Sequence, residues 1–253
     1  MPPTDSSTLG DRSGHHGNAV LVTGGSGVIG RAVCLAFAHA GWSVGVHYHT
    51  RPNEAAHTVW LMRDTSPHTT LYKADIRLYG EVHDMVDLFA KDHGSLNVMI
   101  CNAGIASGQL TVRHPNDDWQ RIIETNLTGT FHCIRAAGAS MAAGGGSIIV
   151  IGSYAGSQGG AGQAAYASAK AGLIGLVRTA AREWGTSDIR VNLVYPGRHH
   201  TPLVGNAFNT GIECAGYMLG RPPALDEVAR VISYLAQLKD VSGQVWNLDS
   251  RLV

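Results

Sequence analysis

Residues 19–30 read Ala-Val-Leu-Val-Thr-Gly-Gly-Ser-Gly-Val-Ile-Gly, and this stretch decides the fold. The apolar run 19–23 predicts a short buried strand, and the glycine cluster 24–30 follows it at once. A helix is expected from about residue 28 to residue 40, ending near a further glycine. A strand, a glycine-rich turn and a helix in this order are typical of a dinucleotide-binding unit. In such a unit, backbone N–H groups at the start of the helix hold a pyrophosphate.

The rest of the chain repeats this alternation of strand and helix. Further strands are expected at 43–49, 69–73, 96–100, 147–151, 189–194 and 244–248, and further helices at 53–63, 79–91, 117–139, 162–184 and 225–238. This order favours an α/β fold of the doubly wound Rossmann type, with a mostly parallel seven-stranded sheet flanked by helices. We expect a mobile tail over residues 1–17 and a single domain over 18–253, with a substrate cap over the irregular residues 200–221.

Composition narrows the function classes. The chain has 253 residues, of which 44% are hydrophobic and 15% charged, and its formal net charge is zero, which argues against a nucleic-acid partner. No apolar run reaches the about 18 residues of a membrane span and no signal peptide is evident, so a cytoplasmic protein is expected. The scattered cysteines are typical of reduced core thiols. No metal site is expected, because the histidines show no ligand spacing; His199 and His200 are expected to face substrate or solvent.

The end of the second predicted strand bears on the choice of cofactor. An NAD-binding unit commonly has a carboxylate there, but this chain reads His-Tyr-His-Thr-Arg over residues 47–51. A carboxylate repels a 2′-phosphate, whereas an arginine binds it, so we expect NADP(H) rather than NAD(H). Arg51 is the first candidate for the phosphate, with Thr50 and His49 behind it. The alternative is that Arg51 is a solvated loop charge.

The predicted strand 147–151 and helix 162–184 carry the candidate catalytic residues. Tyr166 and Lys170 are four residues apart, so they share one helix face. A nearby lysine charge favours the phenolate, and we therefore expect the pKa of Tyr166 to fall from about 10 toward neutrality. Ser153 follows the preceding strand, where its hydroxyl can meet the phenol at one substrate oxygen. The Tyr-x-x-x-Lys pattern alone also fits an ordinary surface pair.

Taken together, these motifs resemble the short-chain dehydrogenase/reductase family over residues 19–250, and within it most closely the β-ketoacyl-thioester reductases. The motifs are Thr23-Gly24 with the glycine turn, Asp75, Cys101-Asn102-Ala103-Gly104, Asn126, Ser153, Tyr166-x-x-x-Lys170 and Pro196-Gly197 with Thr201. The resemblance implies hydride transfer between NADP(H) and a carbonyl compound or secondary alcohol, with a ketoacyl thioester as one possible substrate. A homotetramer or homodimer is implied by the same resemblance.

The resemblance also implies a role for each matching residue. Tyr166 is the expected general acid or base, Ser153 polarises the substrate oxygen, Lys170 holds the nicotinamide ribose, and Asn126 holds a water in a proton relay. Asp75 is expected to accept a hydrogen bond from the adenine amino group. The remaining expected cofactor contacts are Thr23, Gly24, Ser26, Gly27, Val28, Ile29, Gly30, Ile76, Asn102, Ala103, Gly104, Pro196, Gly197 and Thr201.

Two departures from the family pattern leave alternatives open. Val28 stands where the compact members of the family carry glycine, and Asp249-Ser250-Arg251 replaces the more usual Asp-Gly-Gly. A β-branched side chain at residue 28 can weaken cofactor binding. One alternative is therefore a non-catalytic protein that only binds the cofactor. Another is an NAD-dependent alcohol or sugar dehydrogenase.

Overall fold

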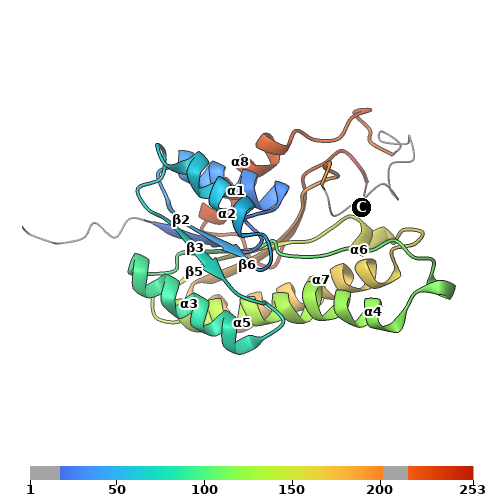
Figure 1. The fold of residues 1–253 in the computed structure, drawn as a ribbon, viewed down its shortest axis with the longest axis horizontal. Helices are drawn as coiled ribbons and strands as arrows, with labels where there is room; N and C mark the ends of the chain where they lie inside the picture. Colours follow the sequence, from blue (N-terminus) through green and yellow to red (C-terminus); the bar gives the residue numbers. More distant parts are fainter. Residues whose placement is uncertain (1–17, 202–215, 253) are drawn as a thin grey trace, which may run out of the picture.

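Strands and helices alternate along the chain, as the sequence predicts (Figure 1). The computed structural model describes residues 18–201 and 216–252, so the expected tail and most of the expected cap lie outside the described residues. The strands are β1 (Ala19–Val22), β2 (Ser43–Tyr48), β3 (Thr69–Lys73), β4 (Val98–Cys101), β5 (Gly146–Ile151), β6 (Ile189–Tyr195) and β7 (Val245–Asn247). The helices are α1 (Val28–His39), α2 (Pro52–Met62), α3 (Tyr79–His93), α4 (Asn116–Ile123), α5 (Gly129–Met141), α6 (Ala155–Gln158), α7 (Ala164–Trp184) and α8 (Leu225–Gln237).

The seven strands form one sheet in the order β3-β2-β1-β4-β5-β6-β7, and every neighbouring pair is parallel. The predicted doubly wound fold is therefore confirmed, and its mostly parallel sheet is parallel throughout the described strands. The chain runs outward from β1 to β3 and then returns to place β4 on the other side of β1. Open parallel sheets bind ligands at the carboxyl ends of the strands beside such a reversal.

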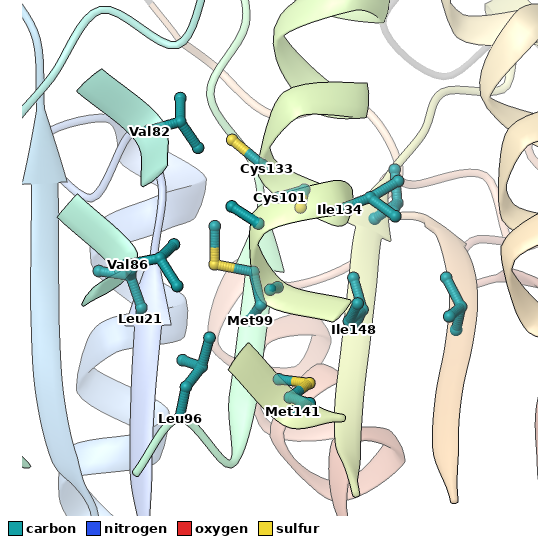
Figure 2. Packing of buried hydrophobic residues seen from close by; sticks show 14 of the residues in the cluster. Leu21, Val82, Val86, Leu96, Met99, Cys101, Cys133, Ile134, Met141 and Ile148 are labelled. Carbon is teal, nitrogen blue, oxygen red and sulfur yellow. The ribbon is translucent and has the colours of Figure 1, made fainter. Parts of the chain in front are cut away.

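Helices cover both faces of the sheet (Figure 1). Helices α1, α2 and α8 lie on one face, and α3, α5 and α7 lie on the other. Each layer buries its own apolar cluster. In the cluster beneath α3, α5 and α7, Met99 and Ile148 from the sheet pack near Ile134 and Met141 of α5 (Figure 2). Two hydrophobic layers of this kind hold the strand ends in fixed positions, because close-packed interiors deform little.

The helix expected over 117–139 is interrupted in the structure. Helix α4 ends at Ile123, a π-helical turn spans Glu124–Thr128, and α5 begins at Gly129. Single π-helical turns inside longer helices occur frequently at functional sites. The short helix α6 is a second difference, because no helix was expected between β5 and the long helix.

The long helix that follows α6 is close to its expected bounds. Helix α7 has 21 residues and begins two residues later than predicted. In the described part of the chain, no helix is both long and apolar enough to cross a membrane.

Candidate active site

The segments at the carboxyl ends of β1, β2, β4, β5, β6 and β7 line a cavity of about 480 Å³. This volume is in the range of small-molecule and cofactor sites. The lining includes these residues expected from the sequence: Gly24, Gly27, Val28, Ile29, Gly30, Arg51, Asn102, Ala103, Gly104, Ser153, Tyr166, Lys170, Pro196, Gly197 and Thr201. Segments that are far apart in the sequence therefore meet at one edge of the sheet.

The glycine turn after β1 needs glycine at two positions. Gly24 has a φ of +65°, and a Cβ there would lie 2.9 Å from the Cα of Ala103. A Cβ on Gly30 would overlap the carbonyl oxygen of Gly24. Val28, by contrast, is the first residue of α1 and lines the cavity, so the turn and the helix form with valine at this position.

Side-chain hydrogen bonds tie this turn to the end of β4. The Thr23 hydroxyl accepts hydrogen bonds from the backbone N–H groups of Asn102 (2.9 Å) and Ala103 (3.0 Å). In return, the Asn102 amide donates to the carbonyl oxygens of Thr23 (2.9 Å) and Gly24 (3.2 Å). Thr23 is buried and is not part of the lining, so it supports the turn from behind.

His47 is a supporting residue that no sequence motif indicates. The Gly24 N–H donates to its Nδ1 at 3.0 Å, and its Nε2 lies 2.9 Å from the carbonyl oxygen of Ala74. Burial lowers the pKa of His47 to about 4, so the ring is neutral at pH 7, with its proton on Nε2. The ring thus connects the glycine turn to the segment after β3. The only sequence signal was a polar residue inside an otherwise apolar strand.

The residues of this edge fit a dinucleotide. The first N–H groups of a helix have no partner inside the helix, and those of α1 start at the cavity wall. Arg51 approaches the same turn, because its Nη2 would lie 3.6 Å from a Cβ on Gly27. The Arg51 side chain makes no hydrogen bond or ion pair with any residue in the described ranges. A positive fork beside a glycine turn is suited to a phosphate.

Several expected cofactor residues are not part of the cavity lining. His49 and Thr50 are exposed. Ser26 is buried in the glycine turn, and Ile76 is buried against Gly129 of α5. Asn126 is buried in the π-helical turn. Asp75 is bound by its neighbour, because Arg77 Nε and Nη2 donate to its carboxylate at 3.0 and 2.5 Å. This hydrogen bonding lowers the pKa of Asp75 and occupies the oxygens expected to face adenine.

Ser153, Tyr166 and Lys170 meet in the cavity. Lys170 Nζ lies 5.8 Å from the centre of the Tyr166 ring and donates to the carbonyl oxygen of Ile151 at 2.7 Å. The Ser153 hydroxyl accepts from the backbone N–H of Ala155 at 3.2 Å and shares a hydrogen bond with Tyr166. The four-residue spacing on α7 and the end of β5 therefore place the three side chains together.

The expected fall in the pKa of Tyr166 is wrong for this structure. Burial raises the pKa of the phenol above its usual value of 10, and the hydrogen bond with Ser153 opposes this only in part. The Lys170 ammonium points instead to the Ile151 carbonyl, and burial lowers the pKa of Lys170 to about 8. At pH 7 the site therefore holds a protonated phenol beside a largely protonated amine.

Asn126 anchors the loop after β4. Its side-chain oxygen accepts from the backbone N–H of Ile105 at 2.8 Å, and its amide nitrogen donates to the carbonyl oxygen of Ile105 at 2.7 Å. A Cβ on Gly104 would lie 3.1 Å from the Asn126 oxygen and 3.9 Å from Lys170 Nζ, so this anchor lies beside the lysine. The buried amide thus has the specific partner that a polar side chain inside a helix requires.

The comparisons with known proteins identify the family. The family model for short chain dehydrogenases matches residues 18–211. This chain belongs to the short-chain dehydrogenase family. It is 34% identical over 237 residues to the 3-oxoacyl-[acyl-carrier-protein] reductase of Synechocystis, covering 92% of this chain and 96% of that protein. The corresponding reductase FabG of Staphylococcus epidermidis is 37% identical over 180 residues, which cover 71% of this chain and 74% of the relative.

A solved structure agrees with this assignment. A short-chain type dehydrogenase/reductase from Mycobacterium marinum superimposes with a TM-score of 0.86 at 30% identity, covering 92% of this chain and 94% of that one. The fold and the order of motifs described above are therefore those of a short-chain dehydrogenase.

The loop after β6 and the end of the chain complete the cavity of this short-chain dehydrogenase. His199 lines it and shares a hydrogen bond of 2.8 Å between its Nε2 and the carbonyl oxygen of Pro196, and burial lowers its pKa. Tyr154 and Arg251 also line the cavity but were not selected as site residues. The only sequence signal for Arg251 is the departure from the family pattern over residues 249–251. The position of Tyr154 in the cavity depends on helix α6, which the sequence did not predict.

Proposed function

We propose that this protein is an NADP(H)-dependent ketoreductase that reduces a carbonyl compound to a secondary alcohol, with 3-oxoacyl thioesters as the first substrates to test. The observation that carries the proposal is the meeting of Ser153, Tyr166 and Lys170 in one cavity with the glycine turn. Two relatives named as 3-oxoacyl-[acyl-carrier-protein] reductases support the substrate class. The Arg51 side chain beside Gly27 supports NADP(H) over NAD(H).

Binding of the cofactor is assigned to the glycine turn with Arg51 and to Lys170. The glycine turn and the first turn of α1 bind the pyrophosphate, Arg51 binds the 2′-phosphate, and Lys170 binds the nicotinamide ribose. When bound, NADPH supplies the hydride for the carbonyl carbon. The charge on Lys170 is present at pH 7, because its pKa of about 8 lies above that pH.

Proton transfer is assigned to Tyr166. Because burial raises its pKa, the phenol holds its proton at neutral pH and donates it to the carbonyl oxygen during reduction. Ser153 donates a hydrogen bond to the same oxygen, where negative charge develops. Asn126 holds the loop after β4 in place beside Lys170. In this proposal it also holds a water molecule of the proton relay.

Replacement of Tyr166 by phenylalanine tests the proposal. Tyr166→Phe removes the proton donor but keeps the ring, so kcat for reduction of acetoacetyl-coenzyme A should fall by about 100- to 10,000-fold. Its Kd for NADPH should change less than about twofold. Tyr234→Phe is the matched control, because Tyr234 is 65% exposed on α8, and its activity should equal that of the wild type.

The pH dependence gives a second readout of the same role. Reduction requires the protonated phenol, so its kcat should fall as the pH rises through the raised pKa of Tyr166, whereas oxidation of the alcohol product should accelerate with pH. Retained activity in Tyr166→Phe would remove Tyr166 from the mechanism. Absence of turnover in the wild type with every ketone and thioester offered would reject the ketoreductase assignment.

A further inference from the structure

Residues 247–251 form a hydrogen-bonded cluster beside the proposed catalytic residues. Arg251 Nε and Nη2 donate to the Asp249 carboxylate at 2.9 and 2.5 Å, and the Arg251 backbone N–H donates to the other oxygen at 2.7 Å. The amide of Asn247 donates to the Arg251 carbonyl oxygen at 2.6 Å. The side chain of Asp249 is fully buried, whereas that of Arg251 is 17% exposed. The guanidinium is therefore fixed by a carboxylate that lies behind it.

Two aromatic rings hold the same guanidinium. Arg251 Cζ lies 4.3 Å from the ring centre of Tyr154 and 4.7 Å from that of Tyr217. Tyr154 directly follows Ser153, so this contact connects Arg251 to the catalytic loop. Tyr217 accepts a hydrogen bond from the backbone N–H of Arg198 at 3.3 Å, which ties it to the loop after β6. Arginine stacks well on aromatic rings, and the stacking restricts its rotamers.

Within the described ranges, one edge of the Arg251 guanidinium is left for a ligand. Its Nη1 has no hydrogen-bond partner among residues 18–201 and 216–252, and the side chain lines the same cavity as Ser153 and Tyr166. The part of the lining that the structure describes contains four cationic side chains and no carboxylate, although the whole chain is neutral. These cations are Arg51, Lys170, Arg198 and Arg251. Asp249 lies behind Arg251, so the ion pair presents its positive end to the cavity.

We propose that Arg251 determines substrate specificity by binding a carboxylate on the substrate, so that the preferred substrate class is an oxo acid rather than a neutral ketone. This inference rests on the proposed ketoreductase function. A guanidinium edge matches a planar carboxylate, and a side chain already held by Asp249 and two tyrosines loses little conformational entropy on binding. With Arg51 and Lys170 assigned to the cofactor, Arg198 and Arg251 remain in the described lining. Of these two, Arg251 is the one stacked on Tyr154, the residue next to Ser153.

Paired probes that differ only in charge test the inference. Binding of levulinate and pyruvate, each against its methyl ester, is measured by calorimetry in the presence of NADPH at pH 7. The wild type should bind at least one acid about 10- to 100-fold more tightly than its ester, as expected for a charge-assisted hydrogen bond. Raising the salt concentration should reduce this preference. The ratio of kcat/KM for acid and ester is the parallel kinetic readout.

The variants are chosen so that the fold survives. Removal of Arg251 alone would leave a buried unpaired Asp249, so the double variant Arg251→Gln/Asp249→Asn keeps paired amides without charge. It should lose the preference for the acid while ester reduction persists. Arg251→Lys keeps the charge and should retain part of the preference. Arg230→Gln, at an exposed ion pair on α8, is the control and should behave as the wild type.

The outcomes separate the two proposals. If the wild type binds every acid no better than its ester, or if the double variant keeps the preference, Arg251 does not bind a substrate carboxylate. Ester or thioester reduction would remain measurable in that case, so the ketoreductase proposal would stand. If the acid binds selectively but no carbonyl compound is reduced, the carboxylate site is supported and the ketoreductase proposal fails.

Discussion

Burial shifts the pKa of three polar side chains at the candidate site. It lowers the pKa of His47 to about 4, raises that of Tyr166 and lowers that of Lys170 to about 8. At pH 7 the site therefore contains a neutral imidazole, a protonated phenol and a charged amine. A phenol that keeps its proton can act as an acid, which fits the role of proton donor proposed for Tyr166.

His47 predicts a defined loss of stability in acid. Its pKa is about 4 in the folded chain and 6.5 in the unfolded chain, so the unfolded state alone binds a proton between these values. The contribution is fully present above pH 6.5 and is lost as the pH falls toward 4. The loss amounts to about 3 kcal/mol of unfolding free energy. Protonation would also break the hydrogen bond from the Gly24 N–H.

His47→Gln isolates this term, because glutamine is polar and does not titrate in this range. Urea unfolding of both proteins at pH 7 and pH 4.5 gives the comparison, in which other titrating groups largely cancel. The wild type should lose more free energy of unfolding than the variant over this interval. Parallel losses in the two proteins would show that His47 carries no proton-linked stability.

Most elements were predictable from local sequence, and the exceptions depend on tertiary contacts. β3 has its predicted bounds, and β2 and β6 differ from theirs by one residue, because β-branched runs bounded by turn residues are local signals. The π-helical turn Glu124–Thr128 was missed because its residues also suit an α-helix. What distinguishes it is the pair of hydrogen bonds between the Asn126 side chain and the Ile105 backbone, 21 residues away in sequence.

The beginning of α1 predicts different effects of alanine at two glycines. A Cβ on Gly30 would overlap the backbone oxygen of Gly24, so Gly30→Ala must displace the glycine turn. NADPH affinity should fall at least tenfold, and the free energy of unfolding should fall by about 1–3 kcal/mol, as is typical of overpacking. In α3, a Cβ on Gly80 meets nothing within 4 Å. Gly80→Ala should therefore keep cofactor affinity and gain up to about 1 kcal/mol of stability.

Chemical unfolding and cofactor titration of the two alanine variants give the measurement. Equal NADPH affinity in Gly30→Ala and the wild type would mean that the turn as described is not the phosphate site. Loss of affinity in both variants would point to a general effect on folding and not to the turn.

At the scale of the whole molecule, the site is assembled from residues that follow six strands, β1, β2, β4, β5, β6 and β7. Each motif lies beside its own strand, which is why Gly24, Ser153 and Tyr166 could be predicted from the sequence. His47 and Arg251 could not, because their roles depend on partners across the sheet or on another loop. The parallel order of the strands brings all of these segments to one edge. The expected cap residues 202–215 lie outside the described part of the chain.

Linkage between cofactor binding and unfolding tests this assembled edge as one unit. A ligand that binds only the folded state at 100 times its Kd adds about 2.7 kcal/mol, which corresponds to a rise in Tm of roughly 5–10 °C for a chain of this size. NADPH should produce a larger rise in Tm than NADH at equal concentration, because Arg51 approaches the turn at Gly27.

In Arg51→Ala the two cofactors should give equal rises in Tm, whereas Arg63→Ala, at an exposed site, should keep the difference. Equal rises in Tm with the two cofactors in the wild type would show that Arg51 does not bind the 2′-phosphate. No rise in Tm with either cofactor would mean that Val28 prevents cofactor binding. The non-catalytic alternative would then be favoured, for a protein that does not bind the dinucleotide.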